Sequence, residues 1–178
     1  MPQLPIRRKG LTEFTFSRFL CPWLCDFRGP SLFLDADMLV LCDIWDLMEL
    51  YDPLYHMQVV QNDQRFEWPS MMLFSNARCQ MLTPDYINDE ANPVNKIWEW
   101  ADIGALPAQY NHCVGYDQPR DDAKIVHFTQ GIPCFKETID SEYAQEWEEE
   151  FRSSIFTVSW EQIMGNSVHY KRVMEKAG

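Results

Sequence analysis

Short apolar runs of four or five residues recur along the chain, separated by polar stretches that contain Pro, Gly and Asp. Runs of this length, bounded by residues that favour turns, are typical of strands. The pattern predicts strands at 31–34, 57–60, 71–74 and 124–128. The first of these, Ser31-Leu32-Phe33-Leu34, ends at Asp35, as a buried strand would.

Helices are predicted between these strands from their capping residues and spacing. Thr, Ser and Asp side chains accept hydrogen bonds from the free N–H groups of a first helical turn, and Pro fits that turn because it has no N–H group. The predicted helices lie at 13–25 after Thr12, at 44–50 after Asp43, from Pro84 after Thr83, at 141–152, and after Ser159. Strands alternating with helices indicate an α/β domain.

Two segments depart from this alternation. Pro22 lies inside the first predicted helix, which we expect it to kink because its ring clashes with the preceding turn. The stretch 88–116 is polar, aromatic and interrupted by proline, and it predicts a long functional loop with short helical turns.

Composition and charge narrow the classes of partner. The 178 residues fit one domain or part of a larger one, and a hydrophobic share of 46% allows a packed core. The net charge of −12 argues against a nucleic-acid partner and against an anionic membrane surface. A ligand that carries phosphate would need a local cation, either basic side chains or a metal ion.

The cysteines and the apolar runs indicate in which cellular compartment the protein is expected. None of the six cysteines forms a C-x-x-C pair, so no zinc site is indicated. The sequence has no basic-then-apolar leader and no apolar run of membrane-spanning length. We therefore expect reduced thiols, no transmembrane segment and a cytoplasmic location.

Asp35 and Asp37 form the sharpest local signal. They follow an apolar strand, with only the small Ala36 between them. On an extended backbone, side chains two residues apart point to the same side, so the two carboxylates can converge on one hard cation such as Mn²⁺ or Mg²⁺. The alternative is a solvated Asp pair in a turn.

His127 forms the second signal. It closes the short apolar run Lys124-Ile125-Val126-His127-Phe128, so its imidazole could supply a further metal ligand. A histidine with a purely structural hydrogen bond remains the alternative.

Two reaction classes fit an Asp-x-Asp sequence after a strand. In phosphatases of the haloacid-dehalogenase type the first Asp is the nucleophile and the second a general acid. That family also needs a hydroxyl residue, for which Thr129 is the candidate, followed by a later acidic pair. Asp121 and Asp122 precede Thr129, which is the wrong order. The second class is glycosyl transfer.

A set of motifs in a fixed order favours the second class. The set contains 12–20 (TEFTFSRFL), 34–40 (LDADMLV) with 43–47 (DIWDL), 68–74 (WPSMMLF), 104–111 (GALPAQYN) and 127–133 (HFTQGIP). Together these motifs resemble the glycogenin-like, family 8 glycosyltransferases, and a bacterial branch of them in particular. The resemblance runs from Thr12 to Trp147.

The resemblance implies a GT-A-type fold, a mixed sheet flanked by helices, and transfer of a hexose from a UDP-sugar donor to a carbohydrate or other hydroxyl acceptor with retention of configuration. It implies that Asp35, Asp37 and His127 bind Mn²⁺ or Mg²⁺ as the cofactor. It places Arg18 beside the donor sugar. The implied donor-binding set is Arg18, Asp35, Ala36, Asp37, Ser70, Asn111 and Gly131. Asp89, Asp102 and Gln109 are candidates for a group that attacks the anomeric carbon, and none is assigned.

The chain also departs from those relatives. They place a phosphate-binding Lys where Pro133 stands, and Lys136 comes later. Only 34 residues precede Asp35, so we expect a single GT-A domain over 1–178 that lacks the amino-terminal part of the nucleotide-binding region. Strand edges exposed by that loss would favour a homo-oligomer or a partner chain. A catalytically silent remnant that acts as a binding or assembly module is the alternative.

Overall fold

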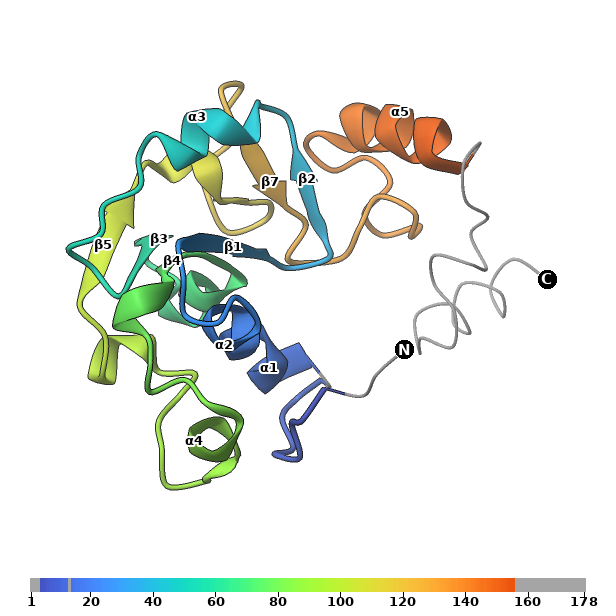
Figure 1. Ribbon diagram of the computed structural model, residues 1–178. Coiled ribbons are helices and arrows are strands. Elements are labelled where there is room, and N and C mark those ends of the chain that lie inside the picture. The colour runs from blue at the N-terminus through green and yellow to red at the C-terminus, as the bar shows by residue number, and fades with distance from the viewer. Residues whose placement is uncertain (1–3, 13, 156–178) are drawn as a thin grey trace.

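The computed structural model describes residues 4–12 and 14–155, so the helix predicted after Ser159 lies outside the described residues. Two sheets form the centre of the described chain (Figure 1). The first has the strand order β1-β4-β3-β5 and the second the order β2-β7-β6. The strands are β1 (Pro30–Leu34), β2 (Met38–Val40), β3 (Met57–Val60), β4 (Met71–Ser75), β5 (Ile103–Leu106), β6 (His112–Cys113) and β7 (Ile125–His127).

Both sheets are mixed. β4 pairs antiparallel with β1 and β3, whereas β3 and β5 run parallel. In the second sheet β2 and β7 are antiparallel and β6 and β7 are parallel. The prediction of an α/β domain with a mixed sheet is confirmed, and each predicted strand is present to within about two residues of its expected ends.

The helices are short except for the last. The α-helices are α1 (Phe14–Ser17), α2 (Cys21–Leu24), α3 (Ile44–Met48), α4 (Pro84–Asn88) and α5 (Ala144–Ile155). The 3₁₀ segments are η1 (Arg18–Leu20), η2 (Arg65–Ser70), η3 (Asn76–Arg78), η4 (Ile97–Glu99) and η5 (Ala108–Tyr110). Two predicted caps are confirmed: the Asp43 side chain accepts from the backbone N–H of Trp45, and the Thr83 hydroxyl accepts from that of Tyr86.

The predicted helix 13–25 is divided rather than continuous. The tighter η1 separates α1 from α2, and Pro22 lies in the first turn of α2. A proline ring clashes with the carbonyl of the residue four positions earlier, here Arg18, which accounts for the change of winding. The division points the Arg18 side chain back toward the sheet, where it reaches Asp35.

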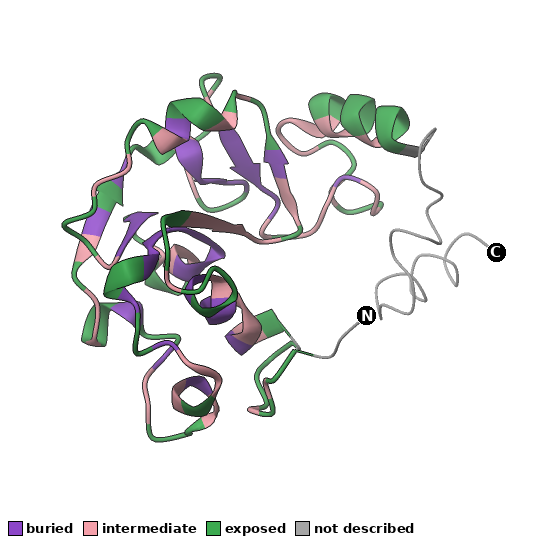
Figure 2. Ribbon diagram, viewed as in Figure 1, coloured by how far each residue is buried: buried purple, intermediate pink, exposed green. Residues whose placement is uncertain are grey.

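The core lies around β3 and β4, whose nine residues are all buried (Figure 2). One apolar cluster packs between the first sheet and the N-terminal helices, and it includes Phe19, Met72 and Phe74. A second includes Leu47 and Leu73 and packs beneath α3. α5 is mostly exposed, and its half-buried Trp147 packs against the rest of the fold.

The expectation that 31–34 is a buried strand is wrong. β1 is only half-buried, because β4 is its single partner and its other side has no strand neighbour within the described residues. Its apolar residues Leu32, Phe33 and Leu34 instead pack at the margins of the two main clusters.

The interpretation of 88–116 as a loop is also incomplete. It contains β5 and β6, each of which pairs parallel with a strand distant in sequence. β5 reads Ile-Gly-Ala-Leu, which has little strand propensity of its own. Its pairing with β3 is therefore imposed by tertiary context.

Candidate metal and donor site

Asp35 and Asp37 lie in the turn that carries the chain from β1 in one sheet to β2 in the other. The backbone N–H of Asp35 donates to the Ser70 carbonyl at 2.9 Å, and the Asp37 carbonyl accepts from the Phe128 N–H at 3.0 Å. These two hydrogen bonds extend the β1–β4 and β2–β7 pairings to the ends of the turn. Ala36 and Asp37 themselves form a turn rather than the extended backbone that we expected.

The turn brings three predicted ligands together. One ligand atom from each of Asp35, Asp37 and His127 lies within 4.8 Å of the others. His127 ends β7 opposite Met38, so the β2–β7 pairing sets its imidazole beside the turn. His127 Nε2 lies 3.4 Å from Asp37 Oδ1.

Arg18 also reaches this cluster. Its Nη1 and Nη2 atoms lie 3.2 and 3.1 Å from the two carboxylate oxygens of Asp35, and Nη1 donates to the Pro69 carbonyl at 2.9 Å. A planar guanidinium that faces a carboxylate in this way forms a bidentate pair. The residue expected beside the donor sugar is thus bound to a candidate metal ligand.

The environment shifts the pKa values of Asp35 and Asp37 in opposite directions. Burial raises the pKa of Asp35, and the nearby charge of Asp37 adds to this, although Arg18 opposes it. Burial would also raise the pKa of Asp37, but the hydrogen bond and the charge of His127 outweigh it and lower that pKa. Asp37 is therefore the carboxyl group more strongly held as an anion.

Glu67 is a further acidic group that we did not predict. Its Oε2 lies 3.8 Å from His127 Nδ1, on the opposite side of the ring from Asp37, and its side chain is only 15% exposed. Burial raises its pKa, with His127 acting against the rise. Glu67 lies in η2, three residues before Ser70, and nothing in its local sequence separates it from the other acids of the chain.

Ser70 and Asn111, predicted separately as donor-pocket residues, are in contact. Asn111 Nδ2 donates to Ser70 Oγ at 3.2 Å, and both residues are buried. The Ser70 hydroxyl in turn donates to the Glu67 carbonyl. Cys113 extends this group, with Sγ 3.7 Å from Asn111 Oδ1 and 3.9 Å from His127 Nδ1. Burial raises the pKa of this thiol to about 12, so it stays protonated.

The remaining predicted residues divide into two groups. Ala36 occupies the turn between the two aspartates, and Gly131 follows His127 at a φ of +116°, which only glycine adopts readily. Asp102 is instead 3.3 Å from both His56 and Arg78. The Gln109 carbonyl accepts from the backbone N–H of Lys124 at 2.7 Å.

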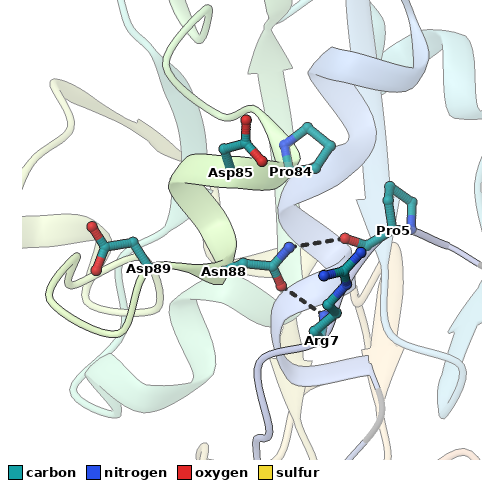
Figure 3. A pocket seen from close by; sticks show the side chains of 6 residues that line it. All are labelled: Pro5, Arg7, Pro84, Asp85, Asn88 and Asp89. Carbon is teal, nitrogen blue, oxygen red and sulfur yellow. Dashed lines mark hydrogen bonds between the residues drawn. The ribbon is translucent and has the colours of Figure 1, made fainter.

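A surface pocket lies apart from the candidate metal ligands. A pocket of about 380 Å³ lies where the N-terminal segment meets α4, lined by Pro5, Arg7, Pro84, Asp85, Asn88 and Asp89 (Figure 3). Asn88 crosses it, donating to the Pro5 carbonyl and accepting from the Arg7 N–H (Figure 3). These contacts fasten the N-terminal segment to α4. The pocket contains Asp89 but none of the donor or metal residues predicted from the sequence.

The residues present fit a hard divalent cation. Two carboxylates and one imidazole supply oxygen and nitrogen donors, which suit Mn²⁺ and Mg²⁺. Arg18 compensates one of the negative charges, and half of the Asp37 side chain (44%) is exposed, so a cation has a route to the cluster.

Comparisons with known proteins show the family to which this chain belongs. No family model matches it. Protein CDI of Arabidopsis thaliana is 31% identical over 182 residues, a match that covers 82% of this chain and 70% of protein CDI. The chain belongs to the family of protein CDI. The expected bacterial branch is not tested by this plant relative and stays a prediction.

Solved structures similar to this CDI-family chain are glycosyltransferases. GlyE of Streptococcus pneumoniae TIGR4 matches with a TM-score of 0.54 at 20% identity, over 76% of this chain and 42% of GlyE. The bifunctional glycosyltransferase WbbM matches with a TM-score of 0.56 at 11% identity, over 95% of this chain and 38% of WbbM. The galactosyltransferase LgtC, in complex with donor and acceptor sugar analogs, matches with a TM-score of 0.54 at 12% identity, over 85% of this chain and 70% of LgtC.

The CDI-family chain therefore has a GT-A-type glycosyltransferase fold, as predicted. It spans less than half the length of GlyE and of WbbM. None of the helices in the described part of the chain has the length and apolar character that a membrane crossing requires.

Proposed function

We propose that this chain is a single-domain, divalent-metal-dependent glycosyltransferase that moves a hexose from a UDP-sugar to a hydroxyl acceptor with retention of configuration. The observation that carries the proposal is the convergence of Asp35, Asp37 and His127 within a GT-A-type fold. The reaction replaces the UDP oxygen at the anomeric carbon with the acceptor oxygen. UDP leaves with the electron pair of the broken bond, and the proton of the acceptor hydroxyl passes to the departing phosphate oxygen or to water.

The chain's own charges support this chemistry. When bound, a divalent cation such as Mn²⁺ would neutralise charge that grows on the diphosphate as the glycosidic bond breaks. Arg18 is the basic side chain in contact with the candidate ligands, and its guanidinium can exchange Asp35 for a phosphate oxygen. Both interactions strengthen as the leaving group gains charge, so they would favour the transition state over the bound substrate.

The buried polar group beside the cluster supports donor binding. Ser70 and Asn111 are buried with their side chains joined. Asn111 keeps a second amide hydrogen, and its Oδ1, which faces Cys113 Sγ, keeps a second lone pair, so both could contact hydroxyl groups of a sugar. With Ala36 and Gly131 on the adjoining turns, they form the proposed donor-binding set. The attacking group is left unassigned.

The test is a panel of UDP-hexoses incubated with Mn²⁺ or with EDTA, followed by NMR. We expect release of UDP from at least one donor, dependent on Mn²⁺, with the sugar keeping its anomeric configuration in the product. Metal binding without any effect of UDP would instead support a silent remnant that serves as a binding or assembly module. Phosphate release from a generic phosphomonoester, lost in Asp35→Asn, would support the phosphatase.

A further inference from the structure

The His127 imidazole is held between two carboxylates on opposite sides of the ring. Nε2 faces Asp37 Oδ1 at 3.4 Å, and Nδ1 faces Glu67 Oε2 at 3.8 Å. The ring is 4% exposed, so surrounding atoms rather than water determine which nitrogen carries a proton. Nε2 is the atom directed toward the aspartates, and without a metal it can donate to Asp37. A cation that binds Nε2 takes the place of that hydrogen, and Nδ1 then carries the ring's hydrogen.

Two groups compete to accept that hydrogen. Cys113 Sγ lies 3.9 Å from Nδ1, but its thiol is directed to the oxygens of Asn111 at 3.7 Å and accepts from Asn62 Nδ2 at 3.4 Å. A thiol sulfur is also a weak acceptor compared with a carboxylate. Glu67 is therefore the favoured partner of Nδ1, and a movement of roughly 1 Å brings it to hydrogen-bond distance.

The position of Glu67 is fixed through its backbone. The Glu67 carbonyl accepts from the Ser70 hydroxyl, and the adjacent Trp68 indole donates to the Asn62 carbonyl at 2.9 Å. The first contact lies within η2, and the second joins η2 to the segment that carries Asn62. The backbone of Glu67 is thus held by neighbouring contacts, and its side chain is 15% exposed.

We propose that Glu67 is a positioning residue for the metal site. It accepts the Nδ1–H of His127, fixes the ring, and so presents Nε2 without a proton toward Asp35 and Asp37. The inference rests on the proposed function, because it assumes that the three side chains bind a cation. Outer carboxylates that orient a histidine in this way commonly change metal affinity by about 10- to 100-fold when they are removed.

The test is calorimetric titration of the nucleotide-free protein with Mn²⁺. Glu67→Ala should weaken binding by about tenfold or more, whereas Glu67→Gln, whose amide oxygen can still accept from Nδ1, should remain within about threefold of the wild type. Asp63→Asn is the matched control, since it removes one exposed negative charge from the segment before η2. Thermal unfolding without metal identifies any variant that fails to fold.

A double-mutant cycle ties the effect to the imidazole. If Glu67 acts through His127, Glu67→Ala should add little once His127→Ala is present. Unchanged affinity in Glu67→Ala would overturn the inference, as would a Glu67→Gln variant as weak as Glu67→Ala, which would indicate a general charge effect. A wild-type protein that does not bind Mn²⁺ would instead contradict the metal site itself and the inference with it.

Discussion

At the scale of single residues, the account depends on the balance of charge around one turn. Three acidic side chains, those of Asp35, Asp37 and Glu67, lie near Arg18 and His127. Arg18 pairs with Asp35 and offsets part of this negative charge, and His127 lies between Asp37 and Glu67. A divalent cation would take over part of that compensation, which makes each residue testable by its effect on metal affinity.

Asp37 is the aspartate whose carboxylate faces His127 and is not paired with Arg18, so we expect its loss to have the largest effect. We expect Asp37→Ala to abolish measurable Mn²⁺ binding in a calorimetric titration. Asp121→Ala, which removes an exposed charge, is the control and should bind as the wild type does. Unchanged affinity in Asp37→Ala would contradict the site.

Arg18 should weaken the binding of Mn²⁺ and strengthen the binding of UDP. Its guanidinium holds both oxygens of Asp35, so a cation must share that carboxylate with a positive charge. Arg18→Gln should therefore raise Mn²⁺ affinity roughly fivefold in the absence of nucleotide, and weaken UDP binding in the presence of Mn²⁺. Titrations with each ligand measure both effects, and a variant that loses Mn²⁺ affinity would be inconsistent with the competition.

Part of this site was predictable from the sequence. Asp35, Asp37 and His127 stand at the ends of apolar strands in motifs with a known order, and the structure brings them together. Glu67 was not predictable, because its approach to His127 arises from the folding of η2 against β7 rather than from any local pattern. The pairing of Arg18 with Asp35 depends equally on tertiary packing.

At the scale of elements, strands with strong apolar runs were predicted from the sequence, and strands without such runs were not. β3 and β4 are apolar and fully buried. β5 and β6 are short and consist partly of residues with weak strand propensity, so their partners in β3 and β7 determine them. Local capping, by contrast, needs only neighbouring residues, which is why the caps of α3 and α4 were predictable.

The N-terminal cap of α3 allows a prediction about stability at the scale of one helix. Asp43 accepts from the Trp45 N–H, and loss of such a cap costs about 1 kcal/mol. Asp43→Ala should lower the free energy of unfolding in urea by about that amount. Asp43→Asn should be close to neutral, because asparagine caps as well as aspartate does. Equal losses in the two variants would show that the charge matters rather than the cap.

Truncating a buried side chain in β4 should reduce stability more than loss of the cap does. Leu73 is fully buried in β4, opposite Leu32 of β1 and Gln58 of β3. Leu73→Ala should destabilise the fold by about 2–5 kcal/mol, because it removes apolar contacts and leaves a cavity. Leu54→Ala, the same substitution at a side chain that is 72% exposed, should change stability by less than about 0.5 kcal/mol. Similar losses at the two positions would place the core elsewhere.

At the scale of the whole molecule, a GT-A-type fold is built around a turn that links two mixed sheets. The fold class was predictable because alternating elements and ordered motifs survive in the sequence. The half-buried state of β1 was not, because it depends on how many strands lie beside it. The chain spans 42% of GlyE and 38% of WbbM, so the nucleotide-binding capacity of these 178 residues has to be measured directly.

Calorimetry of UDP binding, with and without Mn²⁺, is that measurement. The account predicts that UDP binds in the presence of Mn²⁺ and loses most of its affinity in EDTA, because Asp35, Asp37 and His127 would hold the diphosphate through the cation. Equal affinity for UDP in Mn²⁺ and in EDTA, or no binding in either, would contradict it.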